Sequence, residues 1–252
     1  MRFLRFLRKV VMITGASGGI GQALAKGFAR EGATIALVGR NKERTEEIAR
    51  RTGAVYHSTL EITKSENCKK IIDDVFNLTG SLDVLVNNAG AMFRGDVVDT
   101  PDDEWLKLFD INVHAVFYLS REAIRLMREH KIAGNIVQVA SNSALSGRKG
   151  HIAYATTKGA VVQMTRCMAL DCASDGIRIN AVCPGATDTA MPMSKHSAPI
   201  SRERLLENCR QSIPLQRIAD PEEVVRSILF LASEDSSYVT GTTLSVDGGT
   251  TA

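Results

Sequence analysis

A glycine-rich turn near the start of the chain constrains the fold more than any other segment. The letters TGASGGIG at residues 14–21 follow a short apolar run at residues 10–13 and precede a segment of helical composition at residues 22–30. A strand, a glycine turn and a helix in this order bring backbone N–H groups and the positive end of a helix dipole to one place, where a pyrophosphate can bind. The turn therefore predicts a dinucleotide site.

Short apolar runs alternate with helical segments along all 252 residues, with no Pro/Gly/Ser-rich linker between them. We expect further strands at residues 33–38, 54–60, 82–86, 136–139, 177–182 and 243–246, and helices at residues 41–51, 65–78, 101–128, 152–173 and 221–232. Runs buried on both faces and joined by helices are typical of an α/β fold. We predict one domain over residues 1–252, a doubly wound, Rossmann-type parallel sheet with helices on both faces.

The alternation breaks between residues 186 and 214, which are rich in Met, Ser and Pro. Loops this long inside compact domains are usually functional or disordered. We expect a substrate flap at about residues 190–212, with a short helix near residues 202–210. Thioethers pack well against irregular ligands, so Met191 and Met193 are candidates for an apolar wall over the substrate. An exposed loop with no such role is the alternative.

Three side chains carry a recognisable spacing. Ser141 lies thirteen positions before Tyr154, and Lys158 lies four positions after it. Residues four apart share one face of a helix, which makes the phenol and the ammonium neighbours. An ammonium about 4 Å from a phenol is worth roughly 4 kcal/mol at an effective dielectric of about 20. We therefore expect Lys158 to lower the pKa of Tyr154 by up to about three units, which brings it close to the range useful for acid–base chemistry.

Composition excludes several classes of function. The net charge of +3 is small, and the basic residues are not interleaved with aromatic ones, which argues against a nucleic-acid partner. The five cysteines are far apart and the five histidines form no ligand pattern, so we predict reduced thiols, a cytoplasmic protein and no metal. The opening letters MRFLRFLRK favour a charged lead-in to the first strand over a membrane contact, and no membrane partner is expected.

Six features, in order along the chain, resemble motifs of the short-chain dehydrogenase/reductase family. They are TGASGGIG at residues 14–21, NNAG at residues 87–90, Asn112, the Ser141/Tyr154/Lys158 spacing, Pro184-Gly185 and VDGG at residues 246–249. The resemblance covers essentially the full chain and extends to the 3-oxoacyl-carrier-protein-reductase-like subgroup. It implies a seven-stranded sheet in the order 3-2-1-4-5-6-7 and a homotetramer or homodimer.

The resemblance also implies roles for individual side chains. Tyr154 is the general acid or base that interconverts a ketone and a secondary alcohol, and Ser141 donates a hydrogen bond to the substrate oxygen. Lys158 assists Tyr154 and holds the nicotinamide ribose. Asn112 anchors a water chain, although a structural role at a helix kink explains it equally well. The catalytic candidates are Asn112, Ser141, Tyr154 and Lys158, and the substrate candidates are Ser141, Ser143, Tyr154 and Met191.

Cofactor preference depends on the end of the second strand. Family members that prefer NAD place an acid where Gly39 stands, whereas here Arg40 follows, and an Arg pairs well with a 2′-phosphate. We predict NADP(H), with NAD(H) as the alternative if Arg40 is only a solvated charge; Gly18 stands where many NADP-dependent members carry a second basic residue. Glu61 replaces the Asp that often contacts adenine. The predicted cofactor residues are Gly15, Ser17, Gly19, Ile20, Gly21, Arg40, Glu61, Ile62, Asn88, Ala89, Gly90, Tyr154, Lys158, Pro184, Gly185, Thr187 and Thr189.

Together these features predict an NADP(H)-dependent oxidoreductase that acts on a small-molecule ketone or secondary alcohol. A 3-oxoacyl thioester, a sugar or polyol, and a cyclic ketone all remain open as substrates. Asp175 argues against an acidic carrier protein, whereas Arg125, Arg128 and Lys131 keep that partner open. Enoyl reductases of the superfamily space their Tyr and Lys more widely. The alternative from another class is a catalytically silent NADP(H)-sensing regulator or scaffold, against which all four catalytic candidates are present.

Overall fold

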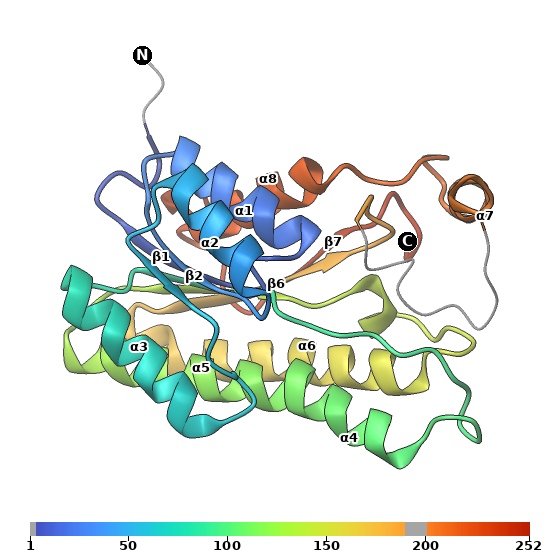
Figure 1. Ribbon diagram of the computed structural model, residues 1–252, viewed down its shortest axis with the longest axis horizontal. Coiled ribbons are helices and arrows are strands. Elements are labelled where there is room, and N and C mark those ends of the chain that lie inside the picture. The colour runs from blue at the N-terminus through green and yellow to red at the C-terminus, as the bar shows by residue number, and fades with distance from the viewer. Residues whose placement is uncertain (1–3, 190–200) are drawn as a thin grey trace.

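The computed structural model describes residues 4–189 and 201–252, apart from the side chains of residues 202 and 205. Seven parallel strands form one sheet in the order β3-β2-β1-β4-β5-β6-β7, and helices pack on both faces (Figure 1). The predicted fold class and strand order are therefore confirmed.

The elements follow the alternation expected from the apolar runs. The strands are β1 Val10–Thr14, β2 Thr34–Val38, β3 Tyr56–Ser58, β4 Val84–Asn87, β5 Asn135–Val139, β6 Arg178–Pro184 and β7 Thr243–Val246. The helices are α1 Gly19–Arg30, α2 Lys42–Thr52, α3 Ser65–Thr79, α4 Asp102–Phe109, α5 Ala115–Glu129, α6 Ile152–Cys172, α7 Arg202–Ser212 and α8 Pro221–Ala232. β3 is shorter than the strand predicted over residues 54–60; it lies at the sheet edge and pairs with β2.

Two apolar cores sandwich the sheet. One side packs α1, α2 and α8 against the strands, with Leu24, Phe28 and Ile228 fully buried. The other side packs α3, α5 and α6, with Ile71 and Met127 fully buried. Since strands covered on both faces lose nearly all contact with water, their side chains are apolar without alternation, and this explains the continuous apolar runs of the sequence.

The predicted helix over residues 101–128 is not one regular helix. A π-helical turn over Asp110–His114 separates α4 from α5. A π turn inserts one residue into the helix and changes the direction of the side chains near it, and such turns occur often at functional sites. Here the turn contains Asn112, which is fully buried.

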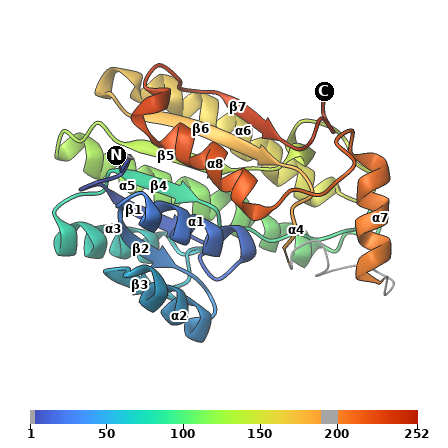
Figure 2. The same cartoon turned by 90° about the horizontal axis from the view of Figure 1, so that it is seen from above.

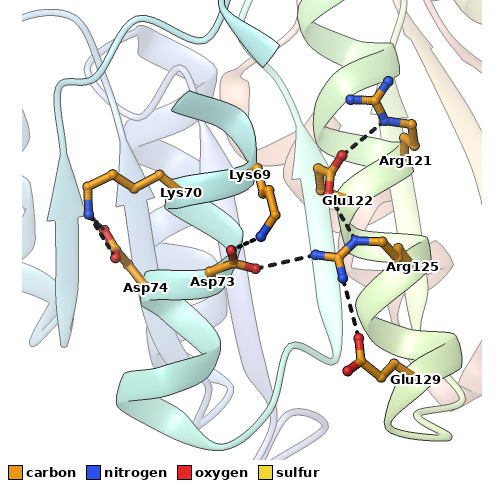
Figure 3. Close-up of polar contacts among 8 residues, drawn as sticks. All are labelled: Lys69, Lys70, Asp73, Asp74, Arg121, Glu122, Arg125 and Glu129. Atoms are coloured by element: carbon orange, nitrogen blue, oxygen red, sulfur yellow. Dashed lines mark hydrogen bonds and ion pairs between the residues drawn. The ribbon is translucent and has the colours of Figure 1, made fainter. Parts of the chain in front are cut away.

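An ion pair connects α3 to α5 on the outer surface of the helices that cover the second face of the sheet (Figure 3). Glu122 accepts hydrogen bonds from Arg121 and Arg125, both at 3.0 Å, and Arg125 also reaches Asp73 at 3.5 Å and Glu129 at 3.3 Å. The side chain of Glu122 is only 8% exposed, so the two guanidinium groups offset the cost of burying its charge.

Helix α7 lies at the same end of the molecule as the start of α4, opposite the N-terminal residues (Figures 1 and 2). It confirms the short helix expected near residues 202–210. Residues 190–200 of the predicted flap, with Met191 and Met193, lie outside the described residues. No described helix is both long enough and apolar enough to cross a lipid bilayer.

Candidate active site

The glycine turn packs directly against the end of β4. Gly15 has a φ of +67°, and a Cβ on it would lie 2.8 Å from the Cα of Ala89. A Cβ on Gly21 would lie 2.1 Å from the carbonyl oxygen of Gly15. Only glycine satisfies these approaches, since real Cβ atoms do not come so near to backbone atoms.

Thr14 holds the two segments together. Its hydroxyl oxygen accepts hydrogen bonds from the backbone N–H groups of Asn88 and Ala89, both at 3.1 Å, and the Asn88 amide donates to the Thr14 carbonyl at 2.9 Å. The predicted residues Gly15, Asn88 and Ala89 are thus brought together. Sequence reasoning did not assign a role to Thr14, although its place at the end of a buried strand was a usable signal.

The start of α1 suits an anionic ligand. Gly18 caps this helix without any side-chain hydrogen bond, and the first turn contains no acidic residue. The first N–H groups of a helix have no partner within it, and the helix dipole adds positive potential there. A Cβ on Gly19 would lie 2.6 Å from the side chain of Thr189. Thr189, also a predicted cofactor residue, therefore borders the glycine turn. The cradle therefore fits the pyrophosphate of a dinucleotide.

Tyr154 and Ser141 form the centre of the candidate catalytic group. Tyr154 is 8% exposed and Ser141 is 7% exposed. Burial raises the pKa of Tyr154, and a hydrogen bond with Ser141 acts in the opposite direction. Ser141 begins a short 3-10 turn over Asn142–Ala144, and its hydroxyl accepts the backbone N–H of Ser143 at 3.1 Å.

Lys158 is buried one turn after Tyr154. Its ammonium donates to the carbonyl of Val139 at 2.8 Å and lies 6.0 Å from the centroid of the Tyr154 ring. Burial lowers the pKa of Lys158 to about 8. We expected Lys158 to lower the pKa of Tyr154, but burial raises it. Desolvation has the larger effect on the phenol, whose pKa is raised, while the ammonium is directed to the end of β5.

Asn112 connects the π turn to the rest of the site. Its carboxamide accepts the N–H of Ala91 at 2.8 Å and donates to the Ala91 carbonyl at 2.9 Å and to the Thr157 hydroxyl at 3.0 Å. Thr157 in turn donates to the carbonyl of Tyr154 at 2.8 Å. A Cβ on Gly90 would lie 3.3 Å from Asn112 Oδ1 and 3.4 Å from Lys158 Nζ. Asn112 thus has a structural role and also borders Lys158.

Comparison with known proteins identifies the family. A family model described as "Enoyl-(Acyl carrier protein) reductase" matches residues 15–251. The chain is 40% identical over 249 residues to cyclopentanol dehydrogenase of Comamonas testosteroni, covering 97% of both chains. A crystal structure of a short-chain type dehydrogenase/reductase from Mycobacterium marinum superposes with a TM-score of 0.90 at 31% identity, covering 99% of this chain and 98% of the other. The chain belongs to the short-chain dehydrogenase/reductase family.

Other members of the family are equally similar over the whole length. Meso-2,3-butanediol dehydrogenase of Serratia marcescens is 38% identical over 251 residues, which cover 99% of this chain and 97% of that protein. The 3-oxoacyl-[acyl-carrier-protein] reductase of Thermotoga maritima is 36% identical over 250 residues, which cover 98% and 99%. This short-chain dehydrogenase/reductase is accordingly an oxidoreductase related to enzymes that act on alcohols and ketones.

The predicted contacts of the ribose and adenine lie at the ends of β2 and β3. Arg40 is exposed and forms no ion pair with the residues that the structure describes. A Cβ on Gly39 would lie 3.2 Å from Ser17 N, which places the β2 end against the glycine turn. Glu61 is exposed and accepts a hydrogen bond from Thr63 at 2.7 Å, whereas Ile62 packs against the second core.

The remaining predicted residues flank the other side of the site. Pro184 ends β6 beside Val246, and a Cβ on Gly185 would lie 2.8 Å from the Cα of Asp247. The hydroxyl of Thr187 donates to the Gly185 carbonyl at 3.1 Å. Ile20, one residue after Gly19, packs against the first core. The site therefore spans the carboxyl ends of the strands, where ligands bind in open α/β sheets.

Sequence reasoning missed His151. Its ring lies 3.5 Å from the hydroxyl of Ser143, measured from Nδ1, and 6.2 Å from the Tyr154 ring between centroids. Its place three positions before Tyr154, at the start of the same helix, was the available signal. All five cysteines are free thiols, and the described residues contain no group of His, Cys, Asp and Glu able to hold a metal ion.

Proposed function

We propose that this protein is an NADP(H)-dependent oxidoreductase that interconverts a ketone and a secondary alcohol, with Tyr154 as general acid or base. The observation that carries the proposal is the buried group of Ser141, Tyr154, Lys158 and Asn112 beside the glycine turn. A phenol and a hydroxyl that meet in a buried site can bind one substrate oxygen together. When bound, the nicotinamide supplies or accepts the hydride.

The protein's own residues manage the proton and the developing charge. Tyr154 donates its phenolic proton to the substrate oxygen during reduction, and Ser141 donates a hydrogen bond to the same oxygen. Such a hydrogen bond is worth about 3–4 kcal/mol in the transition state. Lys158, with a pKa of about 8, is mostly protonated at neutral pH and stabilises negative charge on the phenol as the proton leaves. Asn112 and Thr157 hold the segments that orient Lys158.

Arg40 supports the preference for NADP(H). Its guanidinium is exposed at the end of β2 with no carboxylate partner among the described residues, and Gly39 leaves no acid to repel a 2′-phosphate. An Arg paired with a phosphate forms charge-assisted hydrogen bonds of the stronger kind. The N–H-rich start of α1 would hold the pyrophosphate.

Two observations favour one type of reaction and one class of substrate. The matching family model is described as an enoyl reductase, but the four-residue spacing of Tyr154 and Lys158 favours ketone reduction. Of Arg125, Arg128 and Lys131, which kept a carrier-protein partner open, the two arginines are engaged in ion pairs within the chain. Arg125 binds Glu122 and Asp73 (Figure 3), and Arg128 binds Asp175 at 2.7 Å. A free small molecule is therefore the favoured substrate.

We also propose that the protein is a cytoplasmic homotetramer or homodimer. Large apolar side chains that remain in water support association, because exposed apolar surface marks sites of contact. Leu170 on α6 is 82% exposed and Phe117 on α5 is 44% exposed. Five free thiols agree with a reducing compartment.

The deciding experiment measures oxidation of NADPH with a panel of ketones and ketose sugars, alongside Tyr154→Phe and the matched variant Tyr238→Phe. Tyr238 is fully exposed, so its change should leave turnover intact. Loss of the general acid should lower kcat about 10²–10⁴-fold. Intact NADPH binding with no turnover by the unchanged protein would instead favour the sensing regulator.

A further inference from the structure

We propose that the substrate of this site carries an anionic group, held by a basic subsite made of Arg94, Arg148 and His151. The inference rests on the proposed ketone–alcohol function and adds a substrate class to it. A carboxylate and a phosphate share the chemistry that this subsite recognises.

Two loops that are distant in sequence form the subsite. The N–H of Gly95 donates to the carbonyl of Gly150 at 3.1 Å, and Gly95 pairs with His151 in a parallel bridge. The N–H of His151 also donates to the carbonyl of Arg148 at 3.2 Å. These bonds place the backbone of Arg94 beside the turn that contains Arg148 and His151.

The subsite borders the reacting atoms. His151 lies 3.5 Å from the Ser143 hydroxyl, and its ring lies 6.2 Å from the ring of Tyr154. A ketone whose oxygen meets Tyr154 and Ser141 would place a group only a few bonds away near His151. The distance suits a short oxo acid or a small ketone phosphate.

The two guanidinium groups of this region have no carboxylate partner among the described residues. Neither Arg94 nor Arg148 forms an ion pair with any residue in the ranges 4–189 and 201–252, and Lys149 lies near Asp96. Residues 190–200, outside those ranges, include no Asp or Glu in their sequence. Two unpaired guanidinium groups beside a reaction site are therefore available to an external anion.

The start of α6 adds to this potential. The side chain of His151, the N-cap residue, accepts no hydrogen bond from the N–H groups of the helix, and the first turn contains no acidic residue. A helix of 21 residues presents unpaired N–H groups and a positive dipole end at this point. The helix dipole and the guanidinium groups thus favour the same sign of ligand charge.

The electrostatic environment agrees with this geometry. Burial lowers the pKa of His151, and the charges of Arg94 and Arg148 lower it further. The same two charges oppose the effect of burial, which raises the pKa of Cys209 on α7. Side chains from three segments therefore experience one positive field, and an anion bound there should raise the pKa of His151.

The first test compares matched substrates. We expect kcat/KM for 3-oxobutanoate to exceed that for its methyl ester at least ten-fold, or kcat/KM for dihydroxyacetone phosphate to exceed that for dihydroxyacetone by the same factor. The two pairs distinguish a carboxylate from a phosphate. In the double variant Arg94→Gln/Arg148→Gln this preference should fall at least ten-fold, whereas Arg50→Gln, an exposed change on α2, should preserve it.

A second measurement does not depend on turnover. The pKa of His151, followed by its imidazole NMR signals, should rise by at least half a unit when 3-hydroxybutanoate or glycerol 3-phosphate is added, and should not move with the uncharged methyl ester or glycerol. Preference for the neutral member of both substrate pairs, or a His151 pKa that no anion moves, overturns the anionic subsite. Absence of turnover with every ketone, together with a shifted His151, would overturn the proposed reaction instead.

Discussion

Two cations at opposite ends of the sheet, Lys158 and Arg178, differ in how many hydrogen bonds they make within the protein. At the carboxyl ends, Lys158 is 4% exposed and makes one hydrogen bond with the described residues, to the carbonyl of Val139. At the amino ends, the guanidinium of Arg178 makes four, to the carbonyls of Leu231, Ser233 and Val239 and the hydroxyl of Ser236. The described residues supply four partners to the guanidinium of Arg178, whereas Lys158 retains N–H donors that no described residue accepts. The incompletely bonded cation indicates which end of the sheet binds ligands.

Charged side chains near the two ends of the sheet also differ in whether they form ion pairs. At the amino ends, Asp83 forms an ion pair with Lys9 at 3.2 Å and accepts the N–H of Val10 at 2.8 Å. Opposite charges are therefore paired within the protein at this end. At the carboxyl ends, Arg40, Arg94 and Arg148 have no ion-pair partner among the described residues. Substitutions at the carboxyl ends should therefore cost activity, and those at the amino ends should cost stability.

Lys158→Met should have the largest effect. We expect kcat to fall about 10²–10⁴-fold because the acid–base group loses its cation. The same change should stabilise the fold at pH 7. The pKa of Lys158 is about 8 in the folded protein against an ordinary value of 10.5, so the unfolded chain binds the proton more tightly.

This linkage gives a distinct pH profile. Between pH 8 and pH 10.5 the free energy of unfolding of the unchanged protein should rise by about 2–3 kcal/mol relative to that of the variant, since the buried ammonium loses its proton. Urea unfolding at several pH values measures the difference, in which titrations that do not depend on Lys158 cancel. A difference that stays constant with pH would contradict the assigned burial cost.

Ser141→Ala should lower kcat about 10²–10³-fold, because one donor to the substrate oxygen is lost. The KM for the cofactor should change little, since Ser141 lies at the substrate side. Steady-state kinetics provide the measurement, and Ser146→Ala, at an exposed position of the same loop, is the matched control. Equal losses in both variants would argue against a specific role for Ser141.

Arg178→Met tests the other end of the sheet. Three carbonyls lose a donor, and we expect the free energy of unfolding to fall by about 2–4 kcal/mol. The kcat of the folded enzyme should remain within about two-fold, because no ligand contact is removed. Arg226→Met, an exposed change on α8, should cost less than about 0.5 kcal/mol. A loss of activity without a loss of stability would reverse the assignment of the two ends.

Arg40→Asp should have the smallest effect of these substitutions, and it tests the unpaired charge at the carboxyl ends of the sheet. Its Kd for NADPH should rise about 30-fold relative to that for NADH, since a charge-assisted contact worth about 2 kcal/mol is replaced by repulsion. Fluorescence titration with both cofactors measures this ratio, and Arg50→Asp near the other end of α2 is the control. An unchanged ratio would leave Arg40 as a surface charge and remove the argument for NADP(H).

Much of the fold could be predicted because it depends on local patterns. Continuous apolar runs marked the buried strands, and the glycine turn at residues 14–21 marked the first crossover. The spacing of Tyr154 and Lys158 could place both on α6, but not the direction of the ammonium, which depends on the Val139 carbonyl 19 residues away. Asn112, in the π turn, exchanges hydrogen bonds with the backbone of Ala91, 21 residues away, and the pairing of Gly95 with His151 joins two loops that no local pattern connects.

The packing around Gly39 limits how this enzyme could change cofactor. A carboxylate at this position would need a Cβ only 2.5 Å from the hydroxyl of Thr45, a fully buried side chain that donates to the carbonyl of Asn41 at 2.7 Å. An acid introduced at position 39 alone would force the Thr45 side chain or its surroundings to shift, and we expect this to lower the stability of the fold. A smaller residue introduced at position 45 before the acid avoids the clash. The effect of an acid at position 39 should therefore depend on the residue at position 45.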